Sequence, residues 1–69
     1  MNFNIECEQE SDGRWLAEVP ELPGVLAYAA TAGEATAKAE ALALRVLAER
    51  LEQKETRALN ISITIPAAA

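Results

Sequence analysis

The sequence predicts an α+β fold with the element order β-β-β-α-β. Three observations lead to this prediction: alternating polarity at both ends of the chain, a proline-rich corner at 19–24, and one long run of helix-forming residues from 32 to about 53. A right-handed crossover through the helix would return the last strand parallel to the first. We therefore expect a four-stranded mixed sheet of order 3-2-1-4, with the helix packed on one face.

The first two strands are expected to form a hairpin. Apolar and polar residues alternate over 3–9, and an Asp-Gly turn follows. Two registers compete. A two-residue turn would set apolar side chains opposite glutamates, whereas a three-residue loop with its glycine in the left-handed conformation pairs Ile5 with Val19 and Cys7 with Ala17. The need for one apolar face favours the three-residue loop, with a bulge.

A rigid corner joins the second strand, 14–19, to the third. Its two prolines can neither donate to a sheet ladder nor extend a helix, and the leucine between them can reach the core. The glycine that ends the corner adopts a positive φ at little cost. The structural residues of this motif are Pro20, Leu22, Pro23 and Gly24.

The third strand is expected over 25–30, between the corner and the start of the helix. The period of a strand leaves its orientation open. Two sets of side chains are alternatives for the core: Val25, Ala27 and Ala29, or Leu26 and Tyr28.

The helix is expected to begin with a capping box formed by Thr31 and Glu34, which would satisfy free amides of the first turn. Its apolar side chains cover an arc wider than one sheet face needs, so we expect part of the arc to meet another chain. These side chains are Ala39, Leu42, Ala43, Leu44, Val46, Leu47 and Leu51.

A charged linker at 54–57 leads to the last strand, expected over 59–65. Strict alternation in this segment places three polar side chains on its outer face, and Pro66 ends it. The domain then covers residues 1–66, and 67–69 form a frayed tail. The outer-face residues are Asn60, Ser62 and Thr64.

Composition limits the classes of function. A chain of 69 residues makes one domain and hides only about 60% of its unfolded surface, so association with another chain would help it. One cysteine and no histidine exclude an internal disulfide and the common zinc sites. A net charge of −5 speaks against DNA binding by this chain alone. Without a membrane-length apolar run or a leader, we expect a cytoplasmic protein.

No residue pattern predicts catalysis, a cofactor or a metal. Glu6, Glu8 and Glu18 share the open face of the hairpin, where a solvated surface explains them better than a metal or proton-sharing site. Cys7 has no histidine to activate it and suits a buried structural thiol. Trp15 suits the core better than a binding hot spot. We therefore expect a protein that is not an enzyme.

Surplus apolar surface is the main hint of a partner. Both expected edge strands are uncharged, and such edges invite pairing with another chain. We expect a homo-oligomer, a contact with a second protein, or both. The residues expected at such interfaces are Leu16, Leu26, Tyr28, Leu44, Asn60, Ser62 and Thr64.

The segment from Ser11 to Leu51 resembles the N-terminal domain of HicB-type antitoxins. The similar features are an Asp-Gly turn, an aromatic-led strand that ends Ala17-Glu18-Val19-Pro20, the following Glu21-Leu22-Pro23-Gly24, and a Thr-x-x-Glu-Ala motif at the helix start. Ala29 and Ala30 stand where the family usually has a glycine followed by an acidic residue.

The resemblance implies a partial ribonuclease-H-like fold without catalysis, and binding to a small basic toxin of the HicA type. That toxin is a ribonuclease with a fold like that of double-stranded-RNA-binding domains, and the antitoxin masks its active surface. Full-length members often carry a C-terminal DNA-binding module. This chain ends after the fourth expected strand, so DNA binding is not expected to transfer. The alternative is a stand-alone homo-oligomeric protein of HicB-like fold with no toxin partner.

Overall fold

The computed structural model describes residues 1–53 and 57–66. It has five short strands and one long helix in the described part of the chain. The predicted linker at 54–57 and tail at 67–69 fall on the remaining residues, apart from Arg57. The elements are β1 (Asn2–Asn4), β2 (Glu6–Gln9), β3 (Trp15–Glu18), β4 (Leu26–Ala29), α1 (Ala32–Gln53) and β5 (Ser62–Thr64).

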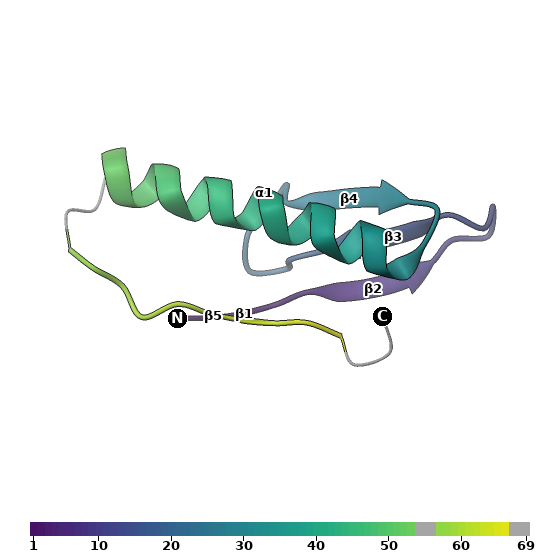
Figure 1. The fold of residues 1–69 in the computed structure, drawn as a ribbon, viewed down its shortest axis with the longest axis horizontal. Coiled ribbons are helices and arrows are strands. Elements are labelled where there is room, and N and C mark those ends of the chain that lie inside the picture. Colours follow the sequence, from purple (N-terminus) through teal and green to yellow (C-terminus); the bar gives the residue numbers. More distant parts are fainter. Residues whose placement is uncertain (54–56, 67–69) are drawn as a thin grey trace.

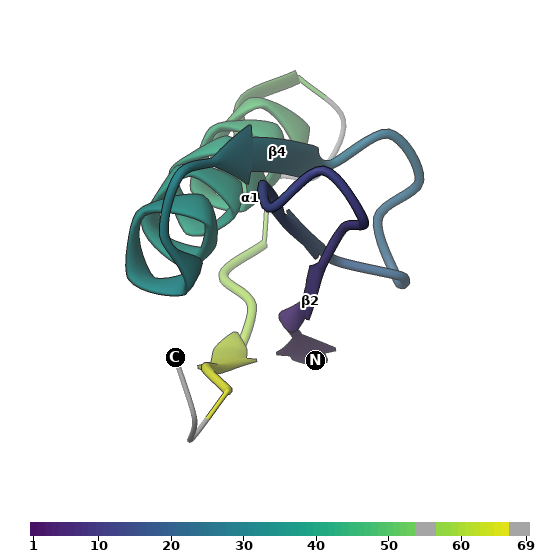
Figure 2. The ribbon, with the colours of Figure 1, turned by 90° about the vertical axis from the view of Figure 1, so that its right-hand side faces the viewer.

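The strands form two sheets, so the predicted single four-stranded sheet of order 3-2-1-4 is wrong. An antiparallel sheet has the order β2-β3-β4, and a separate parallel pair joins β1 to β5. The expected first strand is divided at Ile5, and the last strand is shorter than expected (Figure 1). The helix lies across one face of the antiparallel sheet, and the parallel pair lies below it (Figure 2).

Two chemical features divide the sheet. The chain turns away at the proline corner after β3, so β3 does not continue alongside β1. The backbone N–H of Asn4 donates instead to the Glu21 carboxylate, at 3.2 Å. The Asn4 side-chain amide donates to the same carboxylate at 3.0 Å. On the other side, the register of β1 with β5 would bring Pro66 opposite Glu6. Proline has no N–H to donate, so β5 stops where β2 begins.

The hairpin register agrees with the favoured three-residue loop. Cys7 pairs with Ala17 across β2 and β3. The loop is closed by a hydrogen bond from the N–H of Glu10 to the carbonyl of Arg14 at 2.7 Å, and Gly13 has a φ of 93°. The ladder ends at the pair of Glu6 and Glu18, so the expected neighbouring pair of Ile5 and Val19 lies just beyond it. Ile5 donates its N–H to the carbonyl of Thr64 at 3.0 Å.

The proline corner is closed by its own backbone. The N–H of Leu22 donates to the carbonyl of Val19 at 2.9 Å, and the N–H of Val25 donates to the carbonyl of Leu22 at 3.0 Å. The Leu22 side chain is buried in the core, as expected, and Gly24 has a φ of 90°. Pro20 and Pro23 are exposed. The corner therefore anchors the connection between β3 and β4 to the core through the Leu22 side chain.

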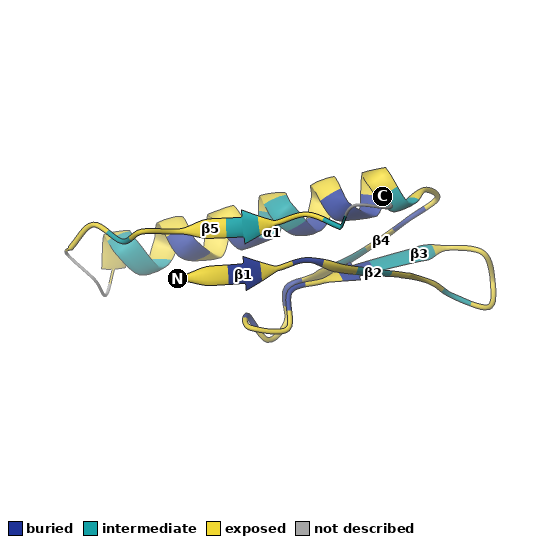
Figure 3. Cartoon of the chain, turned by 90° about the horizontal axis from the view of Figure 1, so that it is seen from below, coloured by how far each residue is buried: buried dark blue, intermediate teal, exposed yellow. Residues whose placement is uncertain are grey.

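The helix packs on the sheet through small side chains. One half of the expected capping box is present: the backbone N–H of Glu34 donates to the Thr31 hydroxyl at 3.1 Å. The return bond, from the N–H of Thr31 to the Glu34 carboxylate, is not among the hydrogen bonds of the described residues. Ala35, Ala39 and Ala43 have no exposed surface, and they face a sheet that presents Ala17. Figure 3 shows the resulting stripe of buried residues along the side of α1 that faces the strands. A ridge of methyl groups lets the helix approach the sheet closely.

Glu21→Ala should loosen β1 and β5 while leaving the antiparallel sheet intact. The pKa of Glu21 is lowered by its own backbone N–H and then by the two Asn4 donors. The carboxylate's contribution is therefore present at neutral pH and is lost as pH falls through the lowered folded-state pKa. Amide hydrogen exchange at pH 7 should show faster exchange in β1 and β5. The exposed residue Glu52, changed to alanine, is the control, and unchanged exchange in β1 of Glu21→Ala would refute this role.

Candidate functional site

The open face of the antiparallel sheet, opposite α1, carries the apolar part of the predicted interface. Leu16 lies beside Tyr28, and Leu26 lies beside Glu18 on the neighbouring strand. Leu26 and Tyr28 are 42% and 40% exposed, whereas Val25 and Ala29 are buried. The structure thus settles the orientation of the third strand that the sequence left open. We call Leu16, Leu26 and Tyr28 the apolar patch.

Carboxylates border the apolar patch on one side. Glu6 is paired with Glu18, and Glu8 is paired with Leu16, so three acidic side chains share the open face with the patch. A hollow of about 160 Å³ lies here, lined by Glu6, Cys7, Glu8, Leu16 and Glu18. Within residues 1–53 and 57–66, the ion pair between Arg14 and Asp12 is the only one, so these glutamates have no cationic partner there. An acidic border beside apolar side chains suits a basic, partly apolar ligand surface.

One cation lies on the other side of the patch. The Arg14 guanidinium carbon is 4.5 Å from the centre of the Tyr28 ring, a cation–π distance. The Nε of Arg14 also donates to the Asp12 carboxylate at 2.8 Å. The pKa of Asp12 is lowered, first by the backbone N–H of Arg14 and then by its side chain. The hairpin loop therefore orients Arg14 over the patch.

The other predicted interface residues lie elsewhere and do not join the patch. Leu44 is 51% exposed on the helix, on the opposite layer of the molecule. Ser62 and Thr64 are exposed on β5, and Asn60 precedes that strand with its carbonyl accepting a hydrogen bond from the N-terminal amine. The predicted set is thus divided among the open face, the helix back and the parallel pair.

Three side chains that could have a chemical or binding role of their own lie in or against the core. Cys7 is half-buried, and its Sγ lies 3.8 Å from the carbonyl of Ala32. Trp15 is half-buried against the core cluster. The Thr36 hydroxyl is buried without a partner among the described residues. Of the three, Cys7 alone lines the open-face hollow, and it is half-buried there.

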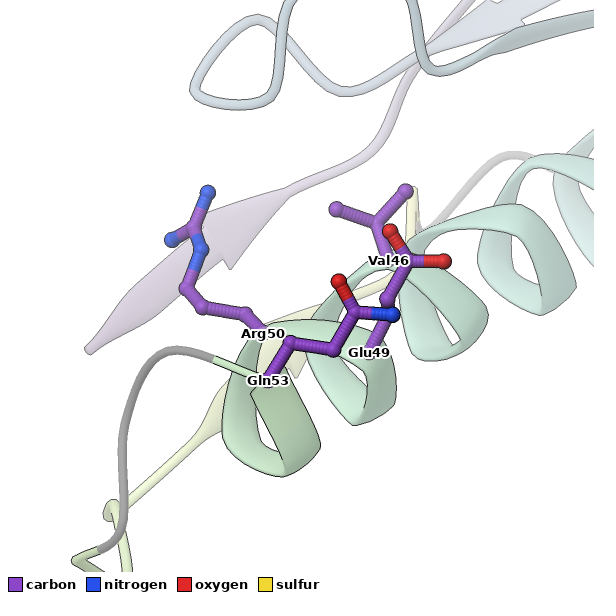
Figure 4. A pocket seen from close by; sticks show the side chains of 4 residues that line it. All are labelled: Val46, Glu49, Arg50 and Gln53. Carbon is purple, nitrogen blue, oxygen red and sulfur yellow. The ribbon is translucent and has the colours of Figure 1, made fainter.

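Sequence reasoning missed a second hollow, of about 200 Å³, on the last turns of α1. The 22-residue helix spans roughly 33 Å and extends past the four-residue strands it covers, which leaves this end uncovered (Figure 1). Figure 4 shows the lining side chains Val46, Glu49, Arg50 and Gln53, all from the helix itself. The i, i+3, i+4, i+7 spacing of these residues in the sequence would have identified the stripe. Because the four side chains all come from one helix, they do not surround a ligand site.

Within the part of the chain that the structure describes, no group of three histidine, cysteine, aspartate or glutamate side chains is placed to hold a metal ion. A search of the same residues finds no helix with the length and apolarity needed to cross a membrane. No family model matches the chain, and neither a curated protein nor a solved structure matches it.

Proposed function

We propose that this chain is a non-enzymatic protein-binding module of the antitoxin type, which sequesters a small basic ribonuclease toxin. The single observation that supports the proposal most is the open sheet face. It combines the apolar patch with the three carboxylates Glu6, Glu8 and Glu18. The HicB-like motifs described above point to the same class of partner.

The two parts of this surface have different roles in the proposed complex. Long-range attraction between a chain of net charge −5 and a basic partner speeds encounter, and it weakens as salt screens it. The apolar patch contributes the affinity, because a few buried aromatic and aliphatic side chains dominate most interfaces. Bound in this way, the antitoxin would cover the toxin's active surface without any chemical step.

The test takes as ligand the product of the neighbouring reading frame, which the proposal expects to be a small basic protein. The double change Glu8→Lys and Glu18→Lys should weaken binding about 10- to 100-fold, because it places cations against a basic surface. Calorimetric titration at low and moderate salt measures the loss. The matched control is Glu49→Lys with Glu52→Lys, which makes the same charge change on the exposed part of α1. Equal losses for both pairs, or no binding by the wild-type chain, would overturn the proposal.

A second candidate is a stand-alone homo-oligomer with no toxin partner. The specific observation in its favour is the outer edge of β4, which lies at the end of the antiparallel sheet and has no charged residue from Val25 to Ala30. Such an edge favours pairing with another strand. The two candidates centre on different features, the backbone edge of β4 and the carboxylates of the open face, but they share the side chains of Leu26 and Tyr28.

A further inference from the structure

The hydrogen-bond pattern identifies which backbone groups of β4 are free. The N–H of Val19 donates to the carbonyl of Val25 at 3.0 Å, so Val25 directs its carbonyl toward β3. Direction alternates along an antiparallel strand, so Ala27 and Ala29 also bond toward β3. The N–H and carbonyl groups of Leu26 and Tyr28 therefore point outward. They have no partner strand in the described residues.

The two edge strands of the antiparallel sheet, β2 and β4, differ in how well each could pair with a second copy of itself. By the same alternation, Cys7 and Gln9 direct their backbone groups outward from β2, as Ile5 does toward Thr64. Two copies of β2 paired through these groups would set Glu8 against the partner's Glu8, and like charges directly opposite destabilise a sheet. The edge of β4 carries no charge of either sign.

We propose that a second copy of this chain pairs with β4 in antiparallel orientation, about a two-fold axis at Ala27. In this register Leu26 lies opposite the partner's Tyr28, and Ala27 lies opposite the partner's Ala27. Four backbone hydrogen bonds then satisfy every outward group of Leu26 and Tyr28. The two three-stranded sheets become one continuous sheet of six strands.

The open face gains charge complementarity in this arrangement. Leu26 packs beside the partner's Tyr28, an aliphatic–aromatic pair across the new ladder. Arg14 lies over Tyr28, and Glu18 lies beside Leu26 on the next strand. The partner's Arg14 is therefore brought toward Glu18, and the symmetric contact forms on the other side of the axis. Two apolar patches also merge into one.

The helix layer accommodates the pairing. Helix α1 packs equally over β3 and β4 and less over β2, so its axis runs between β3 and β4. With strands about 4.8 Å apart, the two helices would lie about 9.6 Å from each other, within the usual distance for packed helices. A second copy therefore fits on this edge without displacing α1.

The test is site-directed disulfide formation in a Cys7→Ala background. Ala27→Cys should cross-link to the partner's position 27, because the Cα atoms of a non-hydrogen-bonded pair lie about 4.5 Å apart. Ala30→Cys is the exposed control: it is six residues out of register with its counterpart and cannot be bridged. After mild oxidation, Ala27→Cys should give at least about ten-fold more linked dimer than Ala30→Cys.

Leu26→Cys and Tyr28→Cys report the two neighbouring registers, so a stronger cross-link at either overturns the proposed axis. Hydrogen exchange of the wild-type chain gives an independent result: the amides of Leu26 and Tyr28 should exchange more slowly as concentration rises. The inference deepens the self-association candidate and does not depend on a toxin. A chain that self-associates without the Ala27 cross-link overturns the register alone, whereas a monomer overturns the candidate as well.

Discussion

Leu47→Ala is expected to destabilise the chain by about 2–5 kcal/mol. The Leu47 side chain is 2% exposed and is one of the large residues that α1 contributes to the core. Truncation loses its transfer free energy and leaves a cavity that short strands can close only in part. A chain of this length has a total stability of about 3–10 kcal/mol, so the loss would be a large fraction of the whole.

Urea denaturation at one fixed protein concentration measures the effect, because self-association would make the midpoint depend on concentration. Leu44→Ala is the matched control on the same helix, since Leu44 is 51% exposed. Leu44→Ala should change the free energy of unfolding by less than about 0.5 kcal/mol if the Leu44 side chain is exposed to solvent. A similar cost for both variants would show that Leu44 is covered in solution by another chain or another copy. A negligible cost for Leu47→Ala would contradict the described core.

Ala39→Leu should cost about 1–3 kcal/mol although it replaces one good helix former by another. Ala39 has no exposed surface and lies in the methyl ridge that sets the distance between α1 and the sheet. A larger side chain there must push the helix away or adopt a strained rotamer. The same substitution at exposed Ala41 keeps the helix propensity and should be nearly neutral. Thermal unfolding compares the two, and equal midpoints would mean that the ridge is not closely packed.

The sequence predicted local structure well because local rules determine it. The hairpin loop follows from the Asp-Gly turn and the requirement for one apolar face, and Cys7 pairs with Ala17 as expected. The cap at Thr31 follows from its spacing to Glu34. The helix from 32 to 53 matches its predicted range, since its residues favour that conformation and no proline interrupts them.

The division of the sheet was missed because it depends on a contact across the chain. Nothing in the alternating segment 3–9 marks Ile5 as a break. The break follows from where the corner carries Glu21, whose carboxylate takes the amides of Asn4. Pro66 was identified as the end of the last strand. That this end falls opposite the first residue of β2 depends on the register between β1 and β5, which the sequence alone does not give. The orientation of β4 likewise required the packing of the helix, because both alternatives were apolar.

Placement of the interface candidates could be predicted only in part. Leu16 was assigned to the open face from the hairpin register, which in turn followed from the choice of a three-residue loop. Leu26 and Tyr28 joined it once their strand's orientation was known. Leu44 and the polar residues of the last strand lie on other surfaces, because alternation within one element does not say which layer the element faces.

The most direct measurement of the central idea, that another polypeptide covers apolar surface of this chain, is sedimentation equilibrium of the wild-type protein from about 1 to 100 μM, a range that brackets ordinary micromolar affinities. We expect a mass that rises toward twice the 7.4 kDa of one chain, and a further increase when the product of the neighbouring reading frame, the partner that the proposal expects to be basic, is added. A folded species that keeps the single-chain mass throughout, both alone and with that product, would contradict the account.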